Sequence, residues 1–204
     1  MAQIALPLGA GKAGPSRIVV GNANAAVLET CAAASLWPFC TAVLFGPPRA
    51  GKSLIAGWFS ASGAGEAIDD ADSLDETELF HRWNRAQESA TPLLIVCNRS
   101  ESEWTIALPD LASRLGAALH LTIAEPDDAM LAELLAVHAE ARGLALGPDA
   151  AAYLVPRMER THMGLERLVG VIDRLSLERK VPPTLSVWRD ALEELMGPSE
   201  PRLL

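Results

Sequence analysis

Short apolar runs alternate with amphipathic segments along the first 125 residues of the chain. Continuous apolar runs of this kind are typical of strands that a parallel sheet buries on both faces. Strands that alternate with helices in this way build α/β folds. The pattern predicts strands at 41–45, 67–68, 92–97 and 118–124, and helices at 24–35, 53–60, 75–88 and 108–115.

Beyond residue 125 the strand pattern does not return. Asp127 is placed to cap a long amphipathic helix over 129–142, and Gly143 is placed to end it. Further helices are predicted at 148–158, 163–179 and 185–196. We therefore predict an α/β domain over residues 17–125 and an all-helical lid domain over residues 126–204.

Residues 1–16 contain too many glycines and prolines for packed regular structure, so they are predicted to form a flexible arm. The arm carries one apolar stretch, QIALPL at residues 3–8. Exposing Ile4, Leu6 and Leu8 on a mobile arm is unfavourable unless these side chains dock somewhere. The stretch therefore either binds a partner or folds back onto its own domain, and the residues alone leave both readings open.

Composition restricts the location and the partners of the protein. The formal net charge is −9 and the pI is about 4.9, whereas direct DNA binding favours clustered Lys and Arg. No apolar run approaches the length of a membrane span, and the N-terminus lacks a signal-peptide pattern. Cys31, Cys40 and Cys97 have no metal-binding or redox spacing. These features predict a cytoplasmic protein with reduced cysteines, without membrane association and without direct sequence-specific DNA binding.

The strongest chemical signal is GPPRAGKS at residues 46–53, which matches G-x-x-x-x-G-K-[ST] between a predicted strand and a predicted helix. Gly46 and Gly51 allow the backbone to curl so that its N–H groups face phosphate oxygens. Lys52 is expected to reach the β- and γ-phosphates, and the Ser53 hydroxyl is expected to ligate Mg²⁺. The segment predicts a binding site for a nucleoside di- or triphosphate, and a purely structural turn is the alternative.

Polar residues follow two further predicted strands. Asp69 comes directly after the strand 67–68, where a carboxylate would hold Mg²⁺ directly or through water, and Asp70 would then polarise a water molecule. A solvated acidic loop is the alternative, because the apolar run before Asp69 is very short. Asn98 follows the strand 92–97, where its amide would sense the γ-phosphate, although an ordinary turn residue would look the same.

Three arginines are candidates for contacts with phosphate. Arg114 lies on the short predicted helix 108–115, and it would act either as a finger into a neighbour's nucleotide site or as a partner in a surface salt bridge. Arg160 and Arg167 flank the start of a helix in the predicted lid domain. They would reach the phosphates if that domain folds over the loop, and a solvated charge is the equal alternative for each.

Taken in order, these features resemble the AAA+ module of DnaA-type proteins over nearly the whole chain. The resemblance is carried by the loop 46–53, by IDDAD at 68–72, by the strand that ends at Asn98, by LPDLASRL at 108–115 and by the helical tail. The segment 108–115 is similar to the family's arginine-finger box almost residue for residue. The resemblance implies a P-loop AAA+ parallel sheet sandwiched by helices, with ADP or ATP and Mg²⁺ as ligands.

Two N-terminal segments extend the resemblance. QIALPL at 3–8 is similar to the family's sliding-clamp-binding motif, and IVVGNAN at 18–24 is similar to its adenine-wrapping segment. The resemblance implies that residues 3–8 dock on the DNA polymerase β sliding clamp and that Arg114 acts in trans on DnaA. Asp70, placed to polarise a water molecule, is the second predicted catalytic residue. The implied contacts are Val19, Val20, Gly46, Pro47, Arg49, Ala50, Gly51, Lys52, Ser53, Leu54, Asn98, Arg160 and Arg167 for the nucleotide, Ser53 and Asp69 for the metal, and Gln3, Ile4, Leu6, Pro7 and Leu8 for the clamp.

The chain departs from the family pattern in two places. Residues 53–68 are too few for the helix, strand and second helix usual in this family, so one β-α unit is predicted to be deleted. The missing strand lies at an edge of the family's sheet, so its loss should leave the phosphate site intact. The helix expected to carry the second-sensor arginine reads MGLER at 163–167 and aligns only with a shift, which leaves Arg160 and Arg167 as alternatives. The helix-turn-helix domain of full-length DnaA has no counterpart after the lid helices, which also predicts that the chain does not bind replication origins.

The leading hypothesis is a regulatory AAA+ protein that docks on the sliding clamp and stimulates ATP hydrolysis by DnaA, which would restrain replication initiation. Its own ATP turnover is expected to be slow, because AAA+ sites are usually completed by a neighbour. A small-molecule kinase is a second reading, although the short segment 53–68 leaves little room for an acceptor pocket. An interaction protein with a vestigial nucleotide site is a third, and self-association of the chain stays open.

Overall fold

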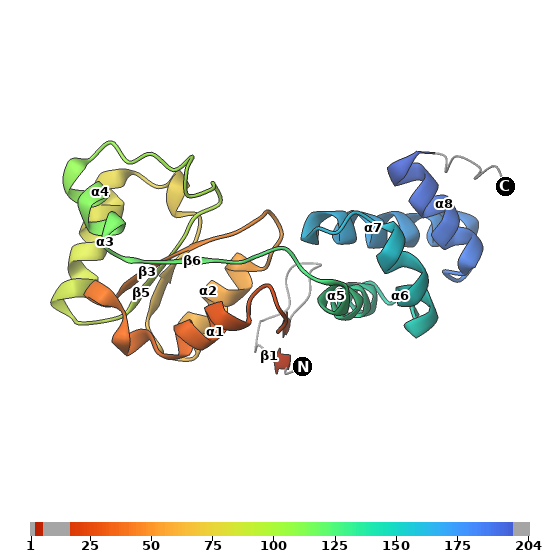
Figure 1. Ribbon diagram of the computed structural model, residues 1–204, viewed down its shortest axis with the longest axis horizontal. Coiled ribbons are helices and arrows are strands. Elements are labelled where there is room, and N and C mark those ends of the chain that lie inside the picture. Colours follow the sequence, from red (N-terminus) through yellow and green to blue (C-terminus); the bar gives the residue numbers. More distant parts are fainter. Residues whose placement is uncertain (1–2, 6–16, 198–204) are drawn as a thin grey trace. The chain divides into compact units, whose positions relative to one another are not determined.

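The computed structural model describes residues 3–5 and 17–197, and for residues 3–5 it describes the backbone alone. The described residues form two units (Figure 1). The α/β unit comprises residues 22–124, and the helical unit combines residues 125–197 with residues 3–5 and 17–21. Residues 17–21, which the sequence analysis placed with the α/β domain, thus cluster with the helices.

Four parallel strands form the sheet of the α/β unit, in the order β4-β5-β3-β6. Strands β3 and β5 are central and buried along their whole length, which explains the apolar runs 42–45 and 93–96. Within the described residues β4 is an edge strand, and the sheet has four strands; the deletion of one β-α unit at this side stays a prediction. The strand bounds are Thr41–Phe45 for β3, Glu66–Ile68 for β4, Leu93–Val96 for β5 and Leu119–Thr122 for β6.

Helices cover both faces of this sheet (Figure 1). Helices α3 (Glu76–Glu88) and α4 (Pro109–Gly116) pack on one face, where alternate strand residues join them in a single apolar cluster. Helix α2 (Lys52–Ala61) contacts β4 and β5. The helix predicted over 24–35 is shorter than expected: α1 spans Ala25–Ala32, and the 3₁₀ turns Ala34–Leu36 and Pro38–Cys40 follow it.

The close approach of α2 to the start of β4 depends on Gly65. A Cβ atom at this position would lie 2.2 Å from the Pro92 carbonyl oxygen and 2.8 Å from the Phe59 ring. Gly65→Ala is therefore expected to lower the free energy of unfolding by about 2–4 kcal/mol, measured by urea denaturation. Gly57→Ala is the matched control, because a methyl group there meets nothing within 4 Å and should raise stability by up to about 1 kcal/mol. Equal stability of the two variants would contradict this packing.

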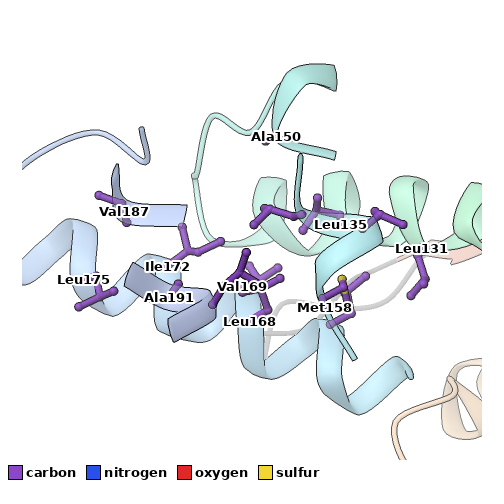
Figure 2. Packing of buried hydrophobic residues seen from close by; sticks show 14 residues of the cluster. Leu131, Leu135, Ala150, Met158, Leu168, Val169, Ile172, Leu175, Val187 and Ala191 are labelled. Atoms are coloured by element: carbon purple, nitrogen blue, oxygen red, sulfur yellow. The ribbon is translucent and has the colours of Figure 1, made fainter. Parts of the chain in front are cut away.

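Four helices build the core of the helical unit, and Figure 2 shows the side chains that they bury. Leu131 and Leu135 of α5 face Leu168, Val169 and Ile172 of α7 within this cluster. The helix bounds are Asp128–Ala141 for α5, Pro148–Leu154 for α6, His162–Arg179 for α7 and Leu185–Met196 for α8. No helix among residues 17–197 is both long enough and apolar enough to cross a membrane.

Capping and proline residues set two of the helix ends in this unit. The Asp127 carboxylate accepts a hydrogen bond of 2.8 Å from the Met130 amide, which confirms the predicted cap of α5. The helix predicted over 148–158 is shorter than expected, because α6 ends at Leu154 and a 3₁₀ turn, Val155–Arg157, follows it. Pro156 has no N–H group and so cannot continue the α-helical hydrogen bonds.

A short antiparallel ribbon completes the helical unit. Strand β1 (Gln3–Ala5) pairs with β2 (Arg17–Val19), with Ile4 opposite Ile18. This pairing differs from the expectation of an arm without regular structure before residue 17. It corresponds to the alternative in which the start of the stretch 3–8 folds back onto its own chain. Leu6, Pro7 and Leu8 lie outside the described residues.

Candidate phosphate-binding site

The loop between β3 and α2 has the backbone geometry of an anion site. Gly46 lies so close to the end of β6 that a Cβ atom there would be 2.9 Å from the Ile123 Cβ. Arg49 (φ 66°) and Gly51 (φ 85°) both have positive φ, and Gly51 is the N-cap of α2. Positive φ at these two positions curls the loop over the N-terminus of α2, where backbone N–H groups and the helix dipole attract phosphate.

Lys52 is the buried cation of this loop, with 5% of its surface exposed. Its Nζ donates hydrogen bonds of 2.9 Å to the Gly46 carbonyl oxygen and 3.1 Å to the Pro47 carbonyl oxygen. Burial lowers the pKa of Lys52, because it penalises the charged form, and the nearby Asp69, Asp72 and Asp70 carboxylates oppose this effect. The ammonium is thus desolvated and held at the loop, where an anion would stabilise it.

The acidic residues after β4 meet the residue after β5, as parallel strands that end at one edge of a sheet require. Asp69 and Asp70 are exposed, and Asp70 adopts a left-handed conformation with φ 51°. The Asn98 side-chain amide donates a hydrogen bond to the Asp70 carboxylate. The structure therefore brings Lys52, Asp69, Asp70 and Asn98 together at the carboxyl edge of the sheet.

Asp72 is a structural member of this site to which the sequence assigned no role. Its side chain is 11% exposed, and its carboxylate accepts a hydrogen bond of 2.9 Å from the Asn98 backbone amide. Its other oxygen lies 3.7 Å from Arg99 Nε. The 3₁₀ turn Ala71–Ser73 turns Asp72 back toward β5, so its carboxylate fixes the position of Asn98. The only signal in the sequence was its place in the acidic run 69–72.

The remaining predicted contacts of the loop differ in exposure: Arg49 is exposed and Pro47 half-buried, whereas Ala50 is buried. Ser53 is exposed and Leu54 is half-buried on the first turn of α2. Within residues 17–197 no three His, Cys, Asp or Glu side chains form a metal cluster. The Ser53 hydroxyl and the Asp69 carboxylate nevertheless fit Mg²⁺, which commonly takes one or two protein ligands together with phosphate oxygens.

The side chain of Arg114 on α4 packs against Phe80, Trp83 and Asn84 of α3, which we call the cradle. Its guanidinium carbon lies 4.5 Å from the Phe80 ring centroid and 4.6 Å from the Trp83 ring centroid. Its Nη1 donates a hydrogen bond to the Asn84 side-chain oxygen. These three residues share one face of α3 because they are three and four positions apart. Arg114 is therefore held within its own chain, and a role in a neighbour's site would require it to exchange these contacts.

The other predicted nucleotide contacts belong to the helical unit. Val19 ends β2, and Val20 follows it. Arg160 precedes α7 and donates a hydrogen bond of 2.6 Å to Asp128, and Arg167 on α7 lines a small hollow together with residues of α8. The residues that the structure gathers within one unit are thus the loop 46–53, the acidic turn and Asn98.

His120 connects the segment after Asn98 to the helix that carries Arg114. Its Nδ1 lies 2.7 Å from Glu101 Oε1, and its Nε2 lies 2.9 Å from the Leu115 carbonyl oxygen. Both partners are acceptors, so only the doubly protonated ring satisfies both bonds. Burial opposes this charge, but the bonds to Leu115 and Glu101 outweigh burial and raise the pKa of His120 above its ordinary 6.5.

A raised pKa in the folded state gives stability that is complete below the unfolded pKa and is lost as the pH rises through the folded pKa. His120→Gln is therefore expected to reduce the free energy of unfolding more at about pH 6 than at about pH 8.5. Urea denaturation at both pH values measures the difference. The wild-type chain, measured at the same two pH values, is the reference. If His120→Gln lowers the free energy of unfolding by the same amount at both pH values, the imidazolium form of His120 adds no stability.

No protein-family model matches the chain. Its structure is similar to domain III of the Thermotoga maritima replication initiation protein DnaA, with a TM-score of 0.71 and 15% identity over 89% of this chain and 95% of that one. It is also similar to the Thermotoga maritima RuvB Holliday junction branch migration motor, with a TM-score of 0.61 and 18% identity over 89% of this chain and 73% of that one. The AMPPCP-bound DnaA from Aquifex aeolicus is similar with a TM-score of 0.57 and 17% identity, over 80% of this chain and 66% of that one.

These likenesses define the fold. The chain has the α/β architecture of AAA+ modules, with a four-stranded parallel sheet flanked by helices and followed by further helices. At 15–18% identity the similarity extends to the fold alone.

Proposed function

We propose that this chain is a regulatory AAA+ protein that holds ADP or ATP at residues 46–53. The observation that carries the proposal is the meeting of Lys52, Asp69, Asp70 and Asn98 beside a curled loop at a helix N-terminus. Backbone N–H groups and a lysine on one side, with carboxylates on the other, suit a phosphate chain with its divalent cation.

Lys52 and Ser53 of the loop, together with Asp69, have separate roles in this proposal. Lys52 would exchange its bonds to the Gly46 and Pro47 carbonyl oxygens for bonds to phosphate oxygens, which are stronger because both partners are charged. Ser53 and Asp69 would hold Mg²⁺, and the ion would neutralise phosphate charge.

Hydrolysis by this chain alone should be slow. Asp70, the candidate that would orient an attacking water, accepts a hydrogen bond from Asn98, which competes with a bond to water. Measured steady-state ATP hydrolysis by the isolated chain should therefore stay well below about 1 per second. Fast turnover would favour an autonomous enzyme over a regulator.

The proposed partners are DnaA and the sliding clamp, which would make the chain similar in role to the Hda-type inactivators of DnaA. Arg114 would stabilise the charge that develops on the phosphates in a DnaA-bound ATP. The test is ATP hydrolysis by DnaA in the presence of clamp loaded on DNA, with and without this chain. Stimulation of at least about tenfold that needs both chain and clamp supports the proposal, and an unchanged rate contradicts it.

The clamp contact is tested separately through the stretch 3–8. Replacing Leu6, Pro7 and Leu8 with alanine should abolish binding to the clamp, measured by surface plasmon resonance, because such motifs bind through a few apolar anchors. These residues follow β1, so the pairing of β1 with β2 can persist in the variant. Unchanged affinity would remove the clamp from the list of partners and leave the nucleotide site untouched.

An interaction protein that uses no nucleotide is the second candidate. Its support is that Lys52 already has two hydrogen-bond acceptors within its own loop, so the loop is partly satisfied without phosphate. Calorimetric titration with ADP and ATP separates the two candidates.

A further inference from the structure

A hollow lies between α5 and α6 in the helical unit, in a region that the nucleotide proposal does not use. Its volume is about 610 Å³, within the range of pockets that bind ligands. The lining is mainly apolar and small, and it includes Ala132 and Ala136 of α5 together with Ala151 and Ala152 of α6.

The alanines explain why the hollow exists. Ala132 and Ala136 are one helical turn apart, so they present two short side chains in a row on α5. The larger Leu135 and Val155 also line the hollow, but both are buried in the core of the unit. Short side chains in a row on a helix surface allow another helix to approach closely, because their Cβ atoms leave the groove unfilled.

Acidic groups give this apolar hollow a chemical preference. Glu133 lines it, and its Oε2 atom is shielded from solvent and has no hydrogen-bond partner within the described residues. Asp128, the other acid of the lining, is already paired with Arg160 at 2.6 Å. A shielded carboxylate oxygen without a donor is costly, so a cation that reaches Glu133 would be stabilised there.

We propose that the hollow receives an amphipathic helix of a partner protein that presents an apolar ridge and a lysine or arginine to Glu133. Small residues on α5 and α6 fit the ridge of a third helix, and the carboxylate fits its cation. The formal net charge of −9 favours a basic partner and disfavours nucleic acid. The site is independent of the nucleotide-binding proposal.

The probe is a synthetic helical peptide of about 18 leucines and lysines in amphipathic order, with a leucine–glutamate peptide of equal length as its counterpart. Methyl NMR of alanine-labelled full-length chain reports on Ala132, Ala136, Ala151 and Ala152 directly. The leucine–lysine peptide should shift these four methyl signals, and the leucine–glutamate peptide should not.

Three variants test the contacts. Ala136→Trp fills the hollow from an exposed position, so it should prevent binding without unfolding the chain. Glu133→Gln should weaken binding about tenfold at moderate salt, whereas Glu193→Gln, an exposed acid on α8, should leave it unchanged. Equal effects of Glu133→Gln and Glu193→Gln, or unchanged binding by Ala136→Trp, would overturn the proposal. Sedimentation that detects a dimer broken by Ala136→Trp would also overturn it, because a second copy of the chain would then occupy the hollow.

Discussion

Lys52→Met is expected to weaken the binding of ADP and ATP by at least about a hundredfold, because each hydrogen bond between the ammonium and a phosphate oxygen contributes roughly 1.5–3 kcal/mol. Methionine keeps the length of the apolar stem, so the loop can keep its shape. The variant loses the two hydrogen bonds that Lys52 Nζ donates to the Gly46 and Pro47 carbonyl oxygens, so its free energy of unfolding should fall by about 1–3 kcal/mol, which leaves the chain folded. Calorimetric titration measures the affinity, and thermal unfolding without nucleotide measures the stability.

Lys180→Asn is the matched control. Lys180 ends α7 with φ 55°, a conformation that asparagine tolerates, and it has no proposed part in nucleotide binding. This variant should bind nucleotide as the unchanged chain does. If Lys52→Met and the wild-type chain bind ADP and ATP with equal affinity, Lys52 does not contact the phosphates.

Arg114→Ala is expected to remove the stimulation of ATP hydrolysis by DnaA almost completely, since arginine fingers accelerate phosphoryl transfer by about 10³–10⁵-fold. The variant also loses the contacts of Arg114 with Phe80, Trp83 and Asn84. Its free energy of unfolding should therefore fall by about 1–2 kcal/mol, which leaves the chain folded. Nucleotide binding by the chain itself should not change.

Arg85→Ala controls for the loss of a positive charge near this surface, because Arg85 is exposed on α3. It should leave the stimulation intact. Asn84→Ala removes one contact of the cradle while keeping the arginine, so it should also retain stimulation. Stimulation that survives in Arg114→Ala would mean that this arginine is a structural contact between α4 and α3 and nothing more.

The sheet and the phosphate loop could be predicted because their signals are local. Runs such as 42–45 and 93–97 are apolar throughout, which is typical of strands covered on both faces. The loop 46–53 combines glycines, lysine and serine at fixed spacing, so its backbone geometry follows from neighbouring residues. The small number of strands on the β4 side was also predictable, because only 16 residues run from Ser53 to Ile68.

The missed features depend on contacts between residues far apart in sequence. The Asp72 carboxylate binds the Asn98 amide across 26 positions, and Arg114 lies on the aromatic rings of α3 some 30 positions earlier. The local pattern of apolar and polar residues does not predict such contacts. The pairing of Gln3–Ala5 with Arg17–Val19 was not predicted for the same reason, because a stretch rich in glycine and proline separates the two strands in the sequence.

If residues 46–53 bind an adenine nucleotide, calorimetric titration of the wild-type chain with ADP and Mg²⁺ should show it. About one ADP should bind per chain, with a dissociation constant in the micromolar range or below. If no binding is detected below about 1 mM, the loop does not serve as a nucleotide site, and the chain is an AAA+ fold that works without nucleotide.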